Sequence, residues 1–409
     1  MPRSLAKNPQ SAAPAQTTAT VVSAPKAPTS KSAAASAAVT QATPVNTAIP
    51  EAIRASVLDA IHKAGDEAAM ANEDTAKRTL ARFFTVKDPF DHPLFKQWAA
   101  LVPNLAQETV LEPFSGANHI PATLVKHGWA NEWAAFDIQP SKAKDNAMPS
   151  LKTKKRDTIS DFPKGYNVAV TNPPWLAKNS AKRRGLPFPI TAEDDLYKVA
   201  LKALLDNVGH AAVLLPESFI TQGIWRNRLF GVVSLADSPF EETEHPTCLA
   251  LFLPVGTGDF DIWRGLVRVG SFADLASRLP SAMTDARAPW KFNVPAGVVG
   301  IRCVDNTRGP SIEFVRGETI PTSKIKHSSR SLTRIGGLPD NIDLDAFLAA
   351  AQARLDGWRN LTQDTLLTAF KGTRSDGHHR RRLDFANARM ILDLALGDVS
   401  KSKKSKTAA

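Results

Sequence analysis

The run Asn172-Pro173-Pro174-Trp175 has the clearest chemical meaning in the sequence. It follows an apolar stretch at residues 167–170. Its two prolines have no backbone N–H, and each holds the residue before it in an extended conformation. The run therefore fixes the Asn172 side chain and the backbone carbonyls as acceptors, and Trp175 adds a flat surface for stacking. Such a site suits a planar group that carries an NH2, although a Pro-Pro turn that only ends a strand is the alternative interpretation of this run alone.

A second constellation lies upstream, where the apolar residues 110–111 are followed by an acid and a turn of small residues, Glu112 to Asn118. In open α/β sheets, ligands bind beyond the carboxyl ends of the strands, where such a turn lets the backbone approach a bound molecule. Asp137 follows the next apolar stretch, 133–136. An acid at that strand tip can accept hydrogen bonds from both hydroxyls of a ribose. The alternative is that Glu112 caps a helix and Asp137 belongs to a turn.

The elements that must position these motifs follow from hydrophobic spacing. Short apolar strands alternate with helices, which predicts an α/β fold with a doubly wound, mostly parallel sheet. We expect strands at 109–111, 133–136, 167–170 and 210–215, and helices at 51–84, 91–101, after His119 and at 194–207. Farther along, we expect a hairpin of 298–304 with 311–315, then helices at 344–358 and 361–369, in a C-terminal mixed α+β region.

The 409 residues divide into four predicted segments. Residues 1–50 are rich in Ala, Ser and Pro, which predicts a disordered arm. Residues 51–255 form the predicted ligand-binding domain with N-terminal helices. Residues 256–395 form a second region, and 396–409 a basic tail.

Basic residues gather in three segments of a chain with 51 Lys and Arg against 40 Asp and Glu. Residues 1–50 hold four basic and no acidic residues, 152–184 hold nine and two, and 371–409 hold ten and four. The rest is net negative, so the pattern predicts directional contact with phosphates. Cys248 and Cys303 are the only cysteines and form no CxxC pair, which excludes a disulfide framework and a thiolate zinc site. No apolar stretch approaches the roughly 18 to 20 residues of a membrane helix.

At the two motifs the sequence resembles class I S-adenosylmethionine-dependent amino-methyltransferases, specifically the DNA adenine-N6 methyltransferases. Their first motif, Asp/Glu-Pro-Phe-x-Gly-x-Gly, stands here as Glu112-Pro113-Phe114-Ser115-Gly116-Ala117-Asn118, and their catalytic motif as Asn172-Pro173-Pro174-Trp175. The resemblance covers roughly residues 82–255 and implies a Rossmann-like fold with S-adenosylmethionine as cofactor. Asn118 replaces the family's second glycine, but Asn tolerates a left-handed backbone, so we expect the turn to persist.

The resemblance also implies roles for individual residues. It makes Asn172, Pro173, Pro174 and Trp175 the catalytic group. The implied cofactor-binding residues are Thr85, Glu112, Phe114, Ser115, Gly116, Asp137 and Asp157. No metal site is expected, since the pair His378-His379 has no second ligand pair at zinc spacing.

A basic loop at 178–185 directly follows the catalytic motif. We expect it to hold phosphates beside the pocket, while a solvated surface loop is the alternative. The candidate nucleic-acid-binding residues are Lys178, Lys182, Arg183, Arg184, Arg380, Arg381 and Arg382.

The resemblance thus implies a site-specific methyltransferase that modifies adenine N6 in double-stranded DNA after flipping the base, with a C-terminal target-recognition region. A restriction-modification system with a cognate endonuclease, or a phage or orphan modifier, is the expected setting. The expected location is the cytoplasm of a bacterial or phage-infected cell. Alternatives are an RNA or protein-glutamine acceptor, cytosine N4, or an inactive DNA-binding protein of the same fold.

Overall fold

The computed structural model describes residues 85, 88–236, 238–240, 245–279, 288–327 and 329–407, without the side chains of 371 and 402–407. These residues belong to one compact unit, 51–409. The expected arm at 1–50 and the expected helices at 51–84 lie outside the described residues. Within the described part, no helix is both long and apolar enough to span a membrane.

A nine-stranded sheet forms the first part of this unit, with strands in the order β3-β2-β1-β4-β5-β7-β6-β8-β9. Neighbours from β3 to β5 are parallel, and β7 runs antiparallel to both β5 and β6. The strands are β1 (Val110–Glu112), β2 (Trp133–Asp137), β3 (Lys154–Lys155), β4 (Val168–Thr171), β5 (His210–Pro216), β6 (Leu229–Ser234), β7 (Thr247–Phe252), β8 (Asp261–Arg264) and β9 (Val267–Ser271). The predicted fold class and the four predicted strands are confirmed.

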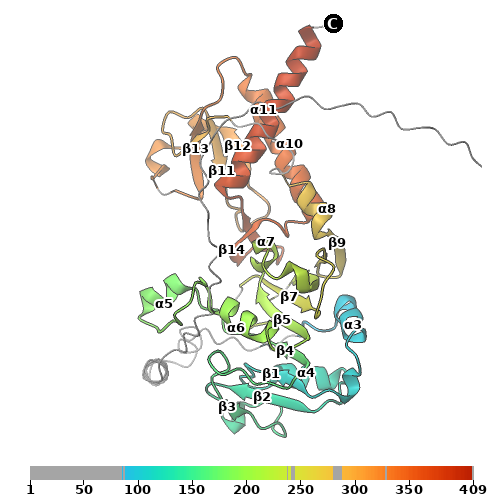
Figure 1. Ribbon diagram of the computed structural model, residues 1–409. Helices are drawn as coiled ribbons and strands as arrows, with labels where there is room; N and C mark the ends of the chain where they lie inside the picture. The colour runs from blue at the N-terminus through green and yellow to red at the C-terminus, as the bar shows by residue number, and fades with distance from the viewer. Residues whose placement is uncertain are drawn as a thin grey trace, which may run out of the picture. The chain divides into compact units, whose positions relative to one another are not determined.

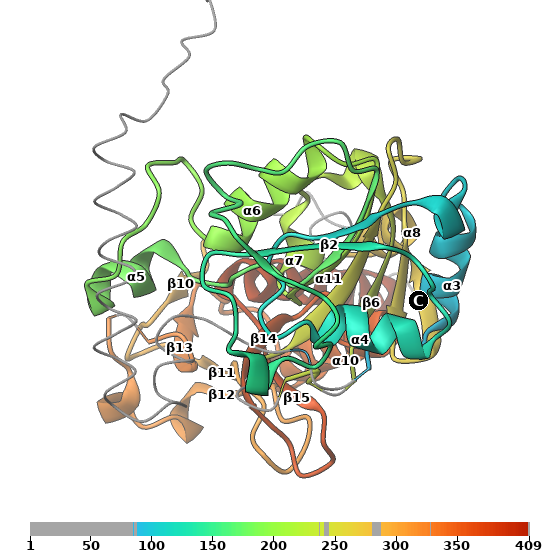
Figure 2. The same cartoon turned by 90° about the horizontal axis from the view of Figure 1, so that it is seen from below.

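Helices cover both faces of this sheet because successive strand residues point to opposite sides. In β4, Val168 and Val170 pack with α3 (Pro93–Ala100) and α4 (His119–Lys126). Ala169 between them packs on the other side with α6 (Leu196–Leu205). Figure 2 shows α4 and α6 on opposite sides of β2. These three helices confirm the predictions at 91–101, after His119 and at 194–207.

The sheet continues past residue 255, since β8 pairs in parallel with β6 and β9 forms the edge. Beyond it, a four-stranded antiparallel sheet has the order β10-β13-β11-β12. Its strands are β10 (Lys291–Phe292), β11 (Val299–Arg302), β12 (Glu313–Arg316) and β13 (Leu332–Gly336). The predicted hairpin is confirmed, because β11 pairs antiparallel with β12. The predicted division of the chain into four segments stays a prediction.

The last third differs from the prediction. Helix α10 (Leu344–Thr362) ends where Gln363 and Asp364 take positive φ angles of 47° and 62°. The expected helix at 361–369 is therefore wrong, and strand β14 (Thr368–Thr373) pairs there with β15 (His379–Arg382). The expected basic tail belongs to helix α11 (Phe385–Thr407), which lies beside α10 (Figure 1). Buried Ala388, Ile391, Leu392 and Ala395 give α11 an apolar stripe at helical spacing.

A buried ion pair joins the nine-stranded sheet to the C-terminal hairpin. Glu217 directly follows β5, and Arg381 lies in β15. The two side chains are 3% and 1% exposed and form two hydrogen bonds of 2.5 and 3.0 Å. The Ser234 hydroxyl donates a further bond to Glu217. Arg381 and these bonds lower the pKa of the Glu217 carboxyl despite its burial, so the pair is held charged in the interior.

We expect Arg381→Met to destabilise the protein by about 3–5 kcal/mol, because it leaves the Glu217 charge buried without a partner. Urea denaturation of the variant and the wild type measures this difference. The control is Arg268→Ala, which breaks an exposed pair with Asp261 and is expected to cost less than about 1 kcal/mol. The double variant Glu217→Leu/Arg381→Met should recover most of the loss, since no charge remains buried. Equal losses of stability in Arg381→Met and Arg268→Ala would contradict a structural role for the buried pair.

Candidate active site at the carboxyl edge of the sheet

The first motif forms a tight turn at the carboxyl end of β1. Glu112 is the last residue of β1, is 1% exposed, and accepts hydrogen bonds from the Phe114 N–H at 3.1 Å and the Thr171 hydroxyl at 2.5 Å. Gly116 and Asn118 have φ angles of 49° and 60°, the left-handed region that the turn requires. The expectation that Asn118 preserves this turn in place of glycine is confirmed.

The Asn118 side chain also fixes the loop after β2. It is fully buried, and its amide nitrogen lies 3.1 Å from Asn146 Oδ1, 3.3 Å from the Leu151 carbonyl and 3.1 Å from Thr153 Oγ1. The Ser115 hydroxyl lies 3.2 Å from the same Thr153 hydroxyl. A glycine at position 118 would offer none of these bonds, so asparagine rigidifies this side of the turn.

Asp137 lies at the tip of β2 and is joined directly to the turn. Its Oδ2 accepts the Gly116 N–H at 2.9 Å, and its Oδ1 accepts the Gln139 N–H at 2.7 Å. These bonds orient the carboxylate, and a carboxylate has about four acceptor positions. The carboxylate is therefore fixed at the carboxyl edge of the sheet, next to the turn.

Asp157 is brought to the same edge by its neighbour. The Thr158 hydroxyl donates to the Pro113 carbonyl at 2.8 Å, which ties residues 157–158 to the first motif. The Asp157 carboxylate itself accepts from the Ile159 N–H and the Ser160 hydroxyl, at 3.1 and 2.7 Å. The structure thus brings together the candidate residues Glu112, Phe114, Ser115, Gly116, Asp137 and Asp157.

The candidate catalytic motif, residues 172–175, follows β4, the strand next to β1. Leu111 in β1 is in register with Ala169 in β4, so the two strands end at the same edge. The hydrogen bond from Thr171 to Glu112 joins the last residues of the two strands directly. The strand order reverses between β1 and β4, and in doubly wound sheets ligands bind at such a switch point. Asn172 and the turn after β1 therefore lie on either side of this switch point.

Trp175 is more enclosed than a stacking platform requires. It is 8% exposed and makes edge contacts with Phe240 and His245, at ring-centroid distances of 5.2 and 5.6 Å. Thr85 forms an isolated antiparallel bridge with Phe240, so Thr85 approaches the catalytic motif through that ring. The Thr85 hydroxyl is buried and has no hydrogen-bond partner among the described residues.

Asp195 anchors the segment after the motif, and the sequence analysis did not single it out. It begins α6 and accepts the N–H groups of Leu176 and Tyr197 at 3.1 and 3.4 Å. Burial raises the pKa of the Asp195 carboxyl to about 6. An Asp directly before an apolar helix is a typical N-cap, and this signal could have identified it. The hydrogen bond from the Leu176 N–H to Asp195 therefore holds the two ends of segment 177–194 together, beside Asn172–Trp175.

The basic segment 178–184 is helix α5 rather than the expected loop, and Gly185 ends it at a φ of 66°. Its four basic side chains are exposed: Lys178, Lys182, Arg183 and Arg184. The Arg183 guanidinium donates to the Ser180 hydroxyl, and the Lys178 ammonium to the Thr191 carbonyl, both at 3.2 Å. The helix therefore presents a cationic surface to solvent.

The expected DNA contact of Arg381 is corrected by the structure, because its side chain is buried against Glu217. Its neighbours Arg380 and Arg382 lie on the other face of β15 and are half-buried. The Arg380 Nε donates to the Asp305 carbonyl at 2.7 Å, and its guanidinium lies over the Phe370 ring. Burial of alternate residues along a strand explains why one of three consecutive arginines is withdrawn from solvent.

The residues present fit a nucleoside-bearing cofactor. Acids end β1 and β2, a left-handed turn lies between them, and an unpartnered Thr85 hydroxyl lies near the catalytic motif. Within the described ranges, no group of three His, Cys, Asp or Glu side chains is placed to hold a metal ion.

Comparison with known proteins gives solved structures only. No family model and no curated protein sequence matches the chain. Similar structures include a type I restriction-modification methyltransferase subunit from Streptococcus thermophilus, with 17% identity, a TM-score of 0.32 and coverage of 46% of this chain and 50% of that one. The M protein of the type I restriction enzyme EcoKI has 12% identity and a TM-score of 0.31, over 52% of this chain and 66% of that one.

A third similar structure is a Listeria monocytogenes protein described as a class I S-adenosylmethionine-dependent methyltransferase. It has 11% identity and a TM-score of 0.32, over 48% of this chain and 69% of that one. The chain spans about half the length of the Streptococcus thermophilus subunit and of two further structures from type I restriction-modification systems. The structural neighbours are thus methyltransferase subunits of restriction-modification systems and class I methyltransferases, at similarity too low to carry a functional argument.

Proposed function

We propose that the protein is an S-adenosylmethionine-dependent methyltransferase that acts on adenine N6 in double-stranded DNA. The observation that supports this most is the hydrogen bond between Thr171 and Glu112, which places the acid-ended turn and the Asn172 motif side by side at the switch point. One motif would hold the methyl donor and the other the amine. The chain needs both at one edge for direct transfer, because reacting atoms must lie about 3–3.5 Å apart.

The chain's own residues would act by positioning and electrostatics. The Asn172 side-chain oxygen and the Pro173 carbonyl would accept hydrogen bonds from the two N6 hydrogens, which raises the lone-pair density on nitrogen. Pro174 holds Pro173 extended, and Trp175 would contact the base. Thr85, Glu112, Phe114, Ser115, Gly116, Asp137 and Asp157 would hold the cofactor, which supplies an electrophilic methyl group on sulfur. After transfer, one N6 proton leaves to solvent.

The acceptor is proposed to be DNA because cations follow the catalytic motif directly. Helix α5 exposes Lys178, Lys182, Arg183 and Arg184 beside the segment that carries Asn172. An adenine in a duplex must be flipped out of the stack to reach such a site, and cations at the rim would hold the flanking phosphates. A protein glutamine needs no such surface. RNA is the competing acceptor, and a cognate restriction endonuclease is the proposed partner.

We expect Asn172→Ala to reduce methyl transfer by about 10²-fold or more, because the acceptor of the N6 hydrogens is lost. The measurement is transfer of labelled methyl from S-adenosylmethionine to unmethylated DNA, with RNA in parallel and nucleoside analysis of the product. Cofactor binding by Asn172→Ala should stay near wild type, while the control Asp137→Ala should lose mainly cofactor affinity. Label in RNA alone, or full activity in Asn172→Ala, would overturn the proposal.

We expect cofactor binding to release close to one proton from Glu112 at pH 7. Burial raises the pKa of this carboxyl to about 8, against the hydrogen bonds from Thr171 and Phe114. Because this pKa lies above 7, the acid is mostly protonated at pH 7, and because it also lies above the unfolded value, its protonated form favours the folded state. Its contribution to stability is complete below about pH 4.5 and is lost as the pH rises through about 8. A nearby cationic ligand lowers the pKa and expels the proton.

Calorimetry in two buffers of different ionisation enthalpy measures the proton release. The Glu112→Gln variant should release fewer protons than the wild type. The product S-adenosylhomocysteine, whose sulfur carries no charge, should release fewer protons than the sulfonium cofactor. Identical proton release from wild type and Glu112→Gln would show that another group titrates.

We expect Arg183→Gln/Arg184→Gln to weaken DNA binding and to reduce the slope of log K against log salt by about 1–2, since each phosphate contact contributes about 0.9. Fluorescence anisotropy at several salt concentrations measures the slope. The matched control is Arg268→Gln/Arg278→Gln, which removes the same charge from exposed arginines that already pair with Asp261 and Asp274. An unchanged slope in the α5 variant would mean that the helix does not touch phosphate.

A further inference from the structure

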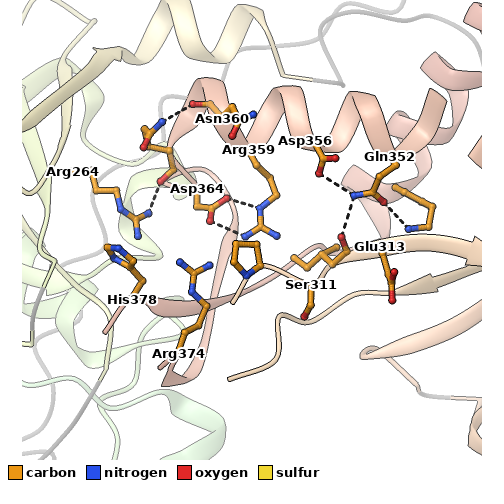
Figure 3. A pocket seen from close by; sticks show the side chains of 14 residues that line it. Arg264, Ser311, Glu313, Gln352, Asp356, Arg359, Asn360, Asp364, Arg374 and His378 are labelled. Atoms are coloured by element: carbon orange, nitrogen blue, oxygen red, sulfur yellow. Dashed lines mark hydrogen bonds and ion pairs between the residues drawn. The ribbon is translucent and has the colours of Figure 1, made fainter. Parts of the chain in front are cut away.

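A cavity of about 740 Å³ lies at the carboxyl end of β8, between that strand, the loop before β12, helix α10 and the β14–β15 hairpin. Figure 3 shows the side chains that line it. Its wall is mostly polar and carries both basic and acidic groups, and Asp364 lies near the basic end. Arg264, Arg374 and His378 converge at one end, whereas Glu313 and Asp356 lie toward the other (Figure 3).

Both arginines at the basic end keep N–H donors that no described residue occupies. Arg264 donates to the Gln363 carbonyl, and no carboxylate of the described residues lies within ion-pair distance of it. Arg374 is 9% exposed, and Asp376 occupies its Nε and Nη2 at 3.1 and 3.0 Å. Its Nη1 has no hydrogen-bond partner among the described residues, and the nearest acid oxygen, on Asp305, is 3.8 Å away.

The carboxylates around this end are already occupied. Asp364 and Asp305 each accept two hydrogen bonds from Arg359, at 2.8–2.9 Å. Glu217 is held by Arg381 in the same way. Burial and the nearby charge of Arg381 lower the pKa of the Arg264 guanidinium, although the carboxylates of Glu217 and Asp364 act in the opposite direction. A cation in such surroundings is stabilised by an added anion.

We propose that Arg264, Arg374 and His378 bind one phosphate group of the DNA backbone. This inference rests on the proposed function and adds a contact at β8, four strands along the sheet from β4. Forked guanidinium donors match a phosphate's oxygens. Glu313 and Asp356 in the same cavity repel a second phosphate, so the site takes one. Arg264 belongs to the nine-stranded sheet, and Arg374 and His378 to the C-terminal hairpin, so the bound phosphate would bridge these two parts.

The test is DNA binding by Arg264→Gln, because Arg264 has no carboxylate partner to leave behind. We expect Kd for a labelled duplex to rise about tenfold at 150 mM salt, equally for all sequences, and the salt slope to fall by about 1. Arg268→Gln, a change of the same charge on the next strand, should have little effect on either quantity. Arg374→Gln should act like Arg264→Gln, with its folding checked by thermal denaturation, since this side chain is buried.

Inorganic phosphate provides a readout that requires neither DNA nor activity. Phosphate should raise the thermal midpoint of the wild type above that in chloride at equal ionic strength, and Arg264→Gln should lose this increment. A wild type that binds and methylates DNA, beside an Arg264→Gln variant with unchanged Kd and slope, would overturn the inference alone. Stabilisation by phosphate with an unchanged DNA slope would assign the cavity to a free phosphate compound and overturn it too. Normal DNA binding that depends on Arg264, without methyl transfer, would instead refute the proposed function and leave this site standing.

Discussion

The reversal of strand order between β1 and β4 is the constraint on which the candidate site depends. Both strands are buried and parallel, and both end at one edge, so the residues that follow them must meet there. This arrangement buries the Glu112 carboxyl, and a buried carboxyl is unfavourable unless it is neutral or hydrogen-bonded. The Thr171 hydroxyl and the Phe114 N–H supply its bonds. The two motifs are therefore coupled through one acid rather than merely adjacent.

A second coupling runs from this sheet to the C-terminal part. Glu217 directly follows β5, the neighbour of the strand that Asn172 follows, and it holds Arg381 of the hairpin in a buried pair. Arg359 joins Asp305 and Asp364 in the same part of the molecule, and its pKa is raised by them. Charges that are buried and paired tolerate little displacement, because separating them leaves an uncompensated ion. This network fixes the hairpin against the sheet, and it also fixes the wall of the cavity that contains Arg264.

The sequence alone was sufficient for features that depend on neighbours in the chain. The strands before Glu112, Asp137 and Asn172 are short apolar runs, and the left-handed turn at Asn118 follows from residue type. It was insufficient where a distant segment decides the outcome. The pairing of Arg381 with a residue 164 positions away cannot be read from three consecutive arginines. Likewise, the β14–β15 hairpin replaces an expected helix because Gln363 and Asp364 end α10 with positive φ angles, which residue type did not indicate at Gln363.

The departure at Asn118 is where sequence and structure bear most closely on the choice between an enzyme and an inactive relative. A missing glycine in a cofactor turn suggests decay if the replacement cannot adopt the glycine's conformation. Here the replacement adopts it, with a φ of 60°, and its buried side chain binds Asn146, Leu151 and Thr153. Those bonds offset part of the cost of a left-handed non-glycine residue, which is of order 1–3 kcal/mol. The substitution therefore exchanges backbone freedom for a fixed loop, and it no longer favours the inactive alternative.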